Sequence, residues 1–117
     1  MVSMRVLLAQ PPLTLAREVI PPLGLCTLAS WLIHLGHEVR IIELDLEIKS
    51  RANGGPESFV QLFLEAMDDF RPNLVGVTSM YSNSLQAEHL VQVAKRFDPR
   101  VTTVAGGSHF GGHRQVV

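Results

Sequence analysis

The residues best suited to hold a ligand lie in a short polar turn that follows an apolar segment. Residues 74–77 read Leu-Val-Gly-Val, which is typical of a strand buried on both faces. Hydroxyl groups donate and accept hydrogen bonds, and an aromatic ring can line a flat ligand. The hydroxyl groups could instead serve only as turn and capping residues. The turn consists of Thr78, Ser79, Met80, Tyr81 and Ser82.

Two adjacent glycines follow a second apolar segment. Gly106 and Gly107 come directly after residues 101–105, and His109 lies two residues further on. Because glycine has no Cβ atom, the pair leaves space for a bulky ligand close to the backbone. The pair could equally form a tight turn between a strand and a helix. His109 could contact the same ligand or simply be solvated.

Composition and charge exclude several classes of function. A net charge of −1 with scattered Lys and Arg residues gives no reason to expect nucleic acid, which binds clustered basic side chains. The single cysteine, Cys26, can form neither a disulfide within the chain nor an iron–sulfur site, and we expect it to be a small core residue. The histidines lack the spacing of metal ligands, so we expect no metal site.

Neither end of the sequence nor its interior suggests a membrane segment. The apolar run near Met1 is too short for a signal peptide, and residues 23–35 are too few to cross a bilayer. We therefore expect a cytoplasmic protein that has no membrane partner.

The elements that position these residues alternate between strands and helices. Apolar runs and alternation predict strands at 4–9, 38–44, 74–77 and 101–105. Helical spacing predicts a helix at 23–35, apolar almost all round and therefore well covered, and another at 56–70. A third helix should be capped by Asn83 and reach Phe97.

This alternation predicts one domain over residues 1–117, a parallel sheet with helices on both faces. We expect a flavodoxin-like (Rossmann-like) three-layer α/β sandwich with strand order 2-1-3-4. Ligands of such sheets bind beyond the carboxyl ends of the strands, where the strand order reverses. The loops at 10–22, 78–84 and 106–113 should therefore meet at one rim. We expect the domain to be truncated, without the last helix and strand of this fold.

Common ligands of this architecture can be tested by motif. The sequence contains neither a G-x-G-x-x-G fingerprint after the first strand nor a P-loop. Gln10 and Thr78 occupy the places where a phosphorelay receiver needs acidic residues. The phosphate loop that flavodoxins use for FMN should follow the first strand, where Pro11 and Pro12 stand instead.

Five segments together resemble the amino-terminal cobalamin-binding domain of cobalamin-dependent radical S-adenosylmethionine enzymes. The family pattern reads N-P-P, then P-P-L-G-L, L-x-x-x-G-H-E-V, P-D-L-V-G-I and V-x-G-G-P-H. The resemblance covers nearly the whole chain in the right order. The matching segments here are Gln10-Pro11-Pro12, residues 21–29 (PPLGLCTLA), 35–39 (LGHEV), 72–77 (PNLVGV) and 104–109 (VAGGSH).

The resemblance implies that the chain binds cobalamin, with the dimethylbenzimidazole tail between the first and third strands and the corrin ring on the rim. Residues 78–80 match the family's S-x-L pattern, with Thr and Met substituted. No histidine lies between Gln10 and Gly24, so we expect no histidine ligand on the lower face of cobalt. The implied cofactor-binding residues are Gln10, Pro11, Pro12, Gly24, Thr78, Ser79, Met80, Tyr81, Ser82, Gly106, Gly107 and His109.

The family also implies a function for a parent protein. Its radical S-adenosylmethionine domain, with a [4Fe-4S] cluster and S-adenosylmethionine, would be the partner of this domain. Cobalt would carry a methyl group from S-adenosylmethionine to an unactivated atom of the substrate. This chain lacks the cluster motif, so we expect no catalytic residues in it. The alternatives are a cofactor-free structural or docking module of the same fold, or a small-molecule sensor domain.

Overall fold

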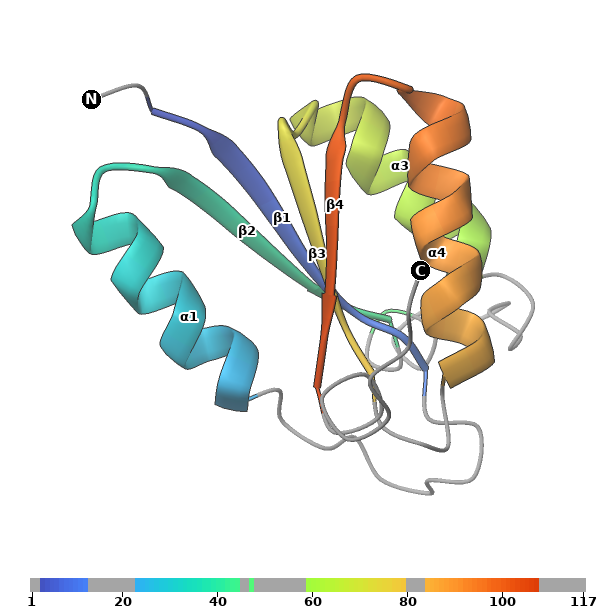
Figure 1. The fold of residues 1–117 in the computed structure, drawn as a ribbon, viewed down its shortest axis with the longest axis horizontal. Coiled ribbons are helices and arrows are strands. Elements are labelled where there is room, and N and C mark those ends of the chain that lie inside the picture. The colour runs from blue at the N-terminus through green and yellow to red at the C-terminus, as the bar shows by residue number, and fades with distance from the viewer. Residues whose placement is uncertain (1–2, 13–22, 45–46, 48–58, 80–83, 108–117) are drawn as a thin grey trace.

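Four parallel strands form the middle layer of the protein in the computed structural model (Figure 1). The structure describes residues 3–12, 23–44, 47, 59–79 and 84–107. The sheet order is β2-β1-β3-β4, as predicted. The strands are β1 (Arg5–Gln10), β2 (Glu38–Glu43), β3 (Leu74–Thr78) and β4 (Thr102–Gly106).

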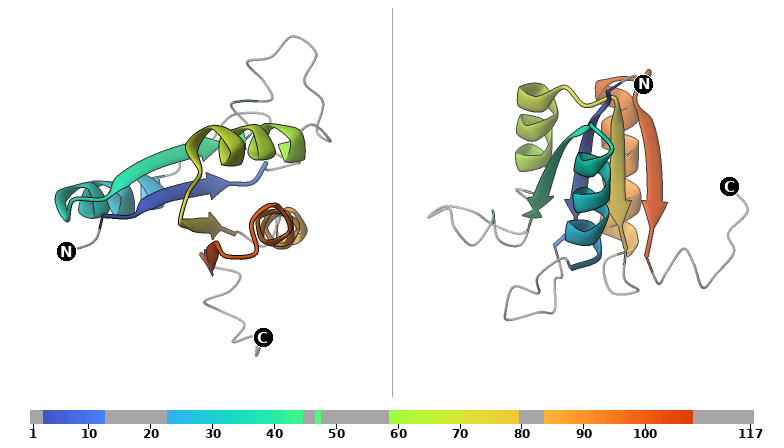
Figure 2. Two further views of the ribbon diagram at one scale, coloured as in Figure 1. Left: turned by 90° about the horizontal axis from the view of Figure 1, so that it is seen from above. Right: turned by 90° about the vertical axis from the view of Figure 1, so that its left-hand side faces the viewer.

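Helices cover both faces of this sheet. Helix α1 (Leu23–His34) lies on one face, where it packs against β1 and β2. Helices α3 (Phe59–Phe70) and α4 (Ser84–Phe97) lie on the other face, α3 over β1 and β2 and α4 over β3 and β4 (Figures 1 and 2). The three-layer α/β sandwich expected from the sequence is confirmed.

The face under α3 and α4 holds the larger hydrophobic core. Leu7 and Ala9 of β1 and Val75 and Val77 of β3 point into it, and all four side chains are buried. They meet Phe63, which is 0% exposed, together with the apolar stripes of both helices. Burial of apolar surface is the main favourable contribution to folding, so most of the stability originates on this face.

The core under α1 is much smaller. Its buried members are Val6 and Leu8 of β1 and Leu25 and Ala29 of α1. The sequence predicted a well-covered helix here, and that prediction is wrong. The helix packs on only half of the sheet face, and it exposes Leu28, Trp31 and Ile33, of which Trp31 is 63% exposed. Cys26, predicted to be a core residue, is also exposed.

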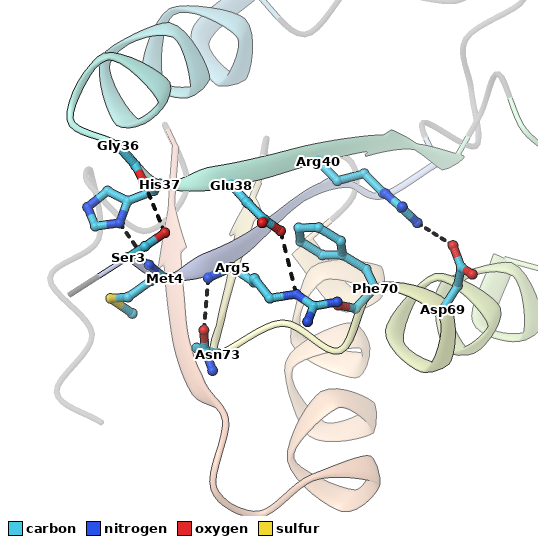
Figure 3. A network of polar contacts seen from close by, with 10 residues as sticks. All are labelled: Ser3, Met4, Arg5, Gly36, His37, Glu38, Arg40, Asp69, Phe70 and Asn73. Carbon is cyan, nitrogen blue, oxygen red and sulfur yellow. Dashed lines mark hydrogen bonds and ion pairs between the residues drawn. The ribbon is translucent and has the colours of Figure 1, made fainter.

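A polar network closes the amino end of the sheet (Figure 3). The backbone N–H of Arg5 donates to Asn73 Oδ1 at 2.8 Å, and its guanidinium donates to the carbonyl of Phe70. The guanidinium groups of Arg5 and Arg40 lie 5.3 and 4.7 Å from the centre of the Phe70 ring. These contacts join β1, β2 and the end of α3, at the edge opposite the strand ends where a ligand would bind.

The boundaries of the elements agree closely with those expected from the sequence. The first and fourth strands each begin and end one residue later than predicted, and α1 ends at His34 rather than at residue 35. Pro56 and Asn83, the predicted start and cap of two helices, lie outside the described residues. None of the helices that the structure describes is long and apolar enough to cross a membrane.

Candidate functional site

The carboxyl ends of the four strands meet at one edge of the sheet because all pairings are parallel. Strand register aligns Gln10 with Glu43 and Thr78 with Gly106. Thr78 comes one residue after the aligned pair Ala9 and Val77, so it stands beside Gln10. We name this line across the four strands the rim row, consisting of Glu43, Gln10, Thr78 and Gly106.

The rim row belongs to the face that α1 covers. Val6 and Leu8 point towards α1, and because side chains alternate along a strand Gln10 does the same. The same alternation places Glu43 with Val39 and Ile41 on that face. Behind the rim row the next line across the sheet is Ile41, Leu8, Gly76 and Val104, which is apolar or without a side chain.

Beyond α1 this face is open over β3 and β4. Val104 is 51% exposed, Thr102 and Gly106 are exposed, and Leu74 and Thr78 are half-buried. Gly76 is buried because Leu8 leans over it: a Cβ atom at Gly76 would lie 2.9 Å from Leu8 Cδ2. We name this surface the open half-face; its residues are Leu74, Gly76, Thr78, Thr102, Val104 and Gly106.

The two glycines after β4 differ in their surroundings. Gly107 has φ of +109°, and a Cβ atom there would lie 2.3 Å from the carbonyl oxygen of Ser79. The backbone N–H of Ser79 donates to the carbonyl oxygen of Gly106 at 2.8 Å. Gly107 therefore allows the chain segments after β3 and β4 to pack backbone against backbone. A Cβ atom at Gly106, by contrast, would meet no atom of the described residues within 4 Å. Gly106 leaves open space at the rim.

Two buried polar side chains of the rim row stand on adjacent strands. Gln10 and Glu43 are each 8% exposed, and each takes part in an interaction in the protein. Burial of a carboxylate and an amide is unfavourable unless polar partners satisfy them. The sequence motifs predicted Gln10 as a cofactor-binding residue but did not include Glu43. The available signal was the alternation of the strand 38–44, which places residue 43 on the same face as residues 39 and 41.

The structure brings together six of the predicted cofactor-binding residues near the carboxyl ends of the strands. Ser79 is 0% exposed and Pro11 is buried, so these two lie inside the rim; Pro12, which follows Pro11, is also buried. Gly24 lies in the first turn of α1 and is exposed. Four predicted residues lie outside the described part of the chain: Met80, Tyr81, Ser82 and His109. The residues brought together are Gln10, Pro11, Thr78, Ser79, Gly106 and Gly107.

The charged side chains of the described residues do not form a metal site. A groove of about 310 Å³ lies between the edge strand β2 and α3, and Glu47, Glu65 and Asp69 line it. Asp69 is paired there with Arg40 at 2.7 Å. No group of three or more metal-ligating side chains occurs among the residues described. The polar character of the rim therefore comes from hydroxyl, amide and carboxylate groups that can hydrogen-bond an organic ligand.

Comparison with known proteins identifies the class to which this fold and rim belong. The family model described as the B12 binding domain matches residues 12–116, which is most of the chain. The chain belongs to the B12-binding domain family.

The similar proteins are named as methyltransferases. Over 118 aligned residues the chain is 32% identical to cytidylyl-2-hydroxyethylphosphonate methyltransferase from Streptomyces wedmorensis, covering 90% of this chain and 22% of that protein. The radical S-adenosylmethionine methyltransferase TsrM from Kitasatospora setae has the same fold. Its structure with cobalamin and a [4Fe-4S] cluster gives a TM-score of 0.73 at 23% identity and covers 93% of this chain. Its complex with tryptophan and an S-adenosylmethionine analogue gives a TM-score of 0.72. The chain spans about a fifth of the length of these relatives (22% and 20%).

Proposed function

We propose that this chain binds cobalamin at the rim row and along the open half-face. The family supports the ligand, and the single observation that carries the position is the space at Gly106. Within the part of the chain that the structure describes, a Cβ atom at Gly106 would have no atom within 4 Å, although its neighbour Gly107 is closely packed. A cofactor tail can approach the backbone only where side chains are absent.

The residues present fit such a ligand. The open half-face offers Val104 as an exposed apolar contact beside Gly76, with the hydroxyl of Thr78 at the rim end. An apolar floor with a few polar groups at one end is typical of cofactor pockets. The hydrogen bond from the Ser79 N–H to the carbonyl oxygen of Gly106 joins the ends of β3 and β4, and Gly107 permits this close approach, so the floor is formed before the ligand binds. Residues Met80, Tyr81, Ser82 and His109 remain part of the proposed site from the sequence.

The proposed role in the parent protein is to hold and orient the cofactor. Bound cobalamin would supply a cobalt centre that carries a methyl group from S-adenosylmethionine to an unactivated atom of the substrate. The names of the relatives support methyl transfer. The radical S-adenosylmethionine domain and its cluster would be contributed by other parts of such a protein. In this chain, residues position the ring and tail and take no part in the chemistry of the reacting atoms.

We further propose that cobalamin binds without a histidine below the cobalt. The sequence from Gln10 to Gly24, which follows β1, contains no histidine. The visible spectrum of the bound cofactor should therefore be of the base-off type. An electron paramagnetic resonance signal of imidazole-ligated cobalt(II) would contradict this part of the proposal.

The experiment that tests the binding site is a titration of the chain with hydroxocobalamin, followed by gel filtration and a visible spectrum of the protein fraction. We expect the wild-type chain to retain cobalamin. Gly106→Val should fold, because its side chain meets open space, and should bind cobalamin at least about tenfold more weakly because it fills that space. Ala105→Val is the matched control, since alternation directs residue 105 to the opposite face of β4.

Far-UV circular dichroism confirms folding of each variant before binding is compared. Equal affinity of Gly106→Val and wild type would overturn the proposed position of the tail. A folded wild-type chain that retains no cobalamin would overturn the proposed function of this chain and favour a structural or docking module of the same fold.

A further inference from the structure

We propose that Glu43 and Gln10 together recognise the primary amide of a propionamide group on the edge of the corrin ring and select it over the corresponding carboxylic acid. This inference rests on the proposed function, since it assigns a partner to two side chains of the same rim. It assigns a specificity role to Glu43, which the sequence motifs do not include.

Geometry places the two side chains where they can act on one group. Gln10 and Glu43 are aligned in the β1–β2 register, and both project from the α1 face at the last position of their strands. Neighbouring strands lie about 4.8 Å apart, so an amide and a carboxylate on adjacent positions can reach the same ligand group. Leu8 and Ile41 stand directly behind them, and these apolar side chains offer no hydrogen bond.

The chemistry of the pair matches a primary amide. A carboxylate only accepts hydrogen bonds, whereas the side chain of Gln both donates and accepts them. A ligand amide can thus pair with Gln10 through its C=O and one N–H, and donate its second N–H to Glu43. Cobalamin carries several primary amides around its ring. A carboxylate in place of that amide would have no N–H to donate and would bring a second negative charge beside Glu43.

The interactions that Gln10 and Glu43 already make do not prevent this role. A carboxylate has two oxygens with about four acceptor positions in total, so an existing partner leaves capacity for a ligand. Gln10 and Glu43 are each 8% exposed as whole residues at the ends of their strands, and a corrin ring on the rim would lie against these ends. The buried part of each side chain fixes its position, and this pre-organisation favours selectivity.

The test compares dissociation constants of hydroxocobalamin and its three propionamide-derived monocarboxylic acids (the b, d and e isomers) at pH 8, by spectroscopic titration of the wild-type chain. We expect one isomer to bind at least about tenfold more weakly than cobalamin, because a hydrogen bond is lost and like charges approach. In Glu43→Gln the preference for the amide over that isomer should fall to less than about threefold.

Glu38→Gln is the matched control. It removes the same charge from the same strand, but at the amino end, where the side chain is 69% exposed and lies 3.8 Å from Arg5. This variant should keep the wild-type preference. Gln10→Met should weaken binding of cobalamin, because hydrogen bonds to the C=O and the N–H of the amide are lost, and should weaken binding of the discriminated acid less, because its carboxylate only accepts hydrogen bonds.

Each result distinguishes this inference from the proposed function. Wild-type protein that binds cobalamin and all three acids equally well would overturn the recognition of an amide while leaving the cobalamin site intact. The same conclusion follows if Glu43→Gln binds cobalamin and discriminates as the wild type does. Failure of the folded wild type to bind cobalamin would overturn both proposals. The affinities of the wild-type chain for cobalamin and the three acids test the inference even if a variant does not fold.

Discussion

The two faces of the sheet are built from the same strands and yet differ in completeness. The face under α3 and α4 is covered across all four strands and holds the larger core. The face under α1 is covered over β1 and β2, and its small core reaches the open half-face at Leu74. Adjacent residues such as Leu7 and Leu8 therefore belong to different hydrophobic cores.

This difference separates stability from binding. A fully packed face provides most of the buried apolar area, which fixes the strands in register. The incomplete face can then carry small residues and exposed backbone at the rim, since its packing is not required to hold the sheet together. The proposed ligand position lies on the incomplete face, where Gly106 leaves room and the side chain of Val104 is exposed.

The largest expected effect comes from truncating neighbouring side chains of β1 that face opposite sides. Leu7→Ala leaves a cavity in the large core and should lower the free energy of unfolding by about 4 kcal/mol. Leu8→Ala should lower the free energy of unfolding by about 2–3 kcal/mol, because side chains beside the open half-face can move into the cavity. Urea unfolding followed by far-UV circular dichroism measures both values. Equal losses would contradict the difference between the two faces.

A smaller effect is expected from adding one methyl group after β4. Gly107→Ala places a Cβ atom 2.3 Å from the carbonyl oxygen of Ser79 at φ of +109°. We expect a loss of about 2–3 kcal/mol of unfolding free energy, since both the close approach and the left-handed backbone disfavour a side chain. Gly106→Ala provides the control, with a change within about 1 kcal/mol. Equal stability of the two alanine variants in thermal unfolding would contradict the difference in packing between Gly107 and Gly106.

The smallest effect is expected on the outer surface of α1. Trp31 is 63% exposed, and its ring lies edge to face with that of His34, with 6.2 Å between the ring centres. Trp31→Ser should change the free energy of unfolding by less than about 0.5 kcal/mol, as is usual for exposed positions. A loss above 1.5 kcal/mol in urea unfolding would show that this surface of α1 contributes to stability in the folded chain.

Most of the fold could be predicted from local patterns in the sequence. The apolar runs of residues 74–77 and 101–105 and the helical spacing from Phe59 to Phe70 identified the elements correctly. Their alternation, together with the rule that crossovers are right-handed, restricted the sheet to few orders. Burial of α1 could not be predicted in this way. Apolar residues on several sides of a helix suggest complete covering, but the surface available to cover it depends on the other elements.

The candidate site could be predicted only in part, because short motifs identify residues but do not show how distant segments pack. Motifs identified Gln10, Thr78, Gly106 and Gly107, and the structure places them along one edge of the sheet. The sequence did not distinguish Gly106 from Gly107, since the close approach of Gly107 to Ser79 arises between two strands. It also did not identify Glu43, whose burial depends on its register with Gln10.

The sequence by itself determined the elements, their parallel arrangement and the family resemblance, because periodicity and short motifs depend on residues close along the chain. Only the tertiary structure decided which positions share a line across the strands, which face stays open and which glycine leaves space. These properties depend on pairs far apart in sequence, such as Ser79 with Gly107, and on helices that cover one half of a face but not the other.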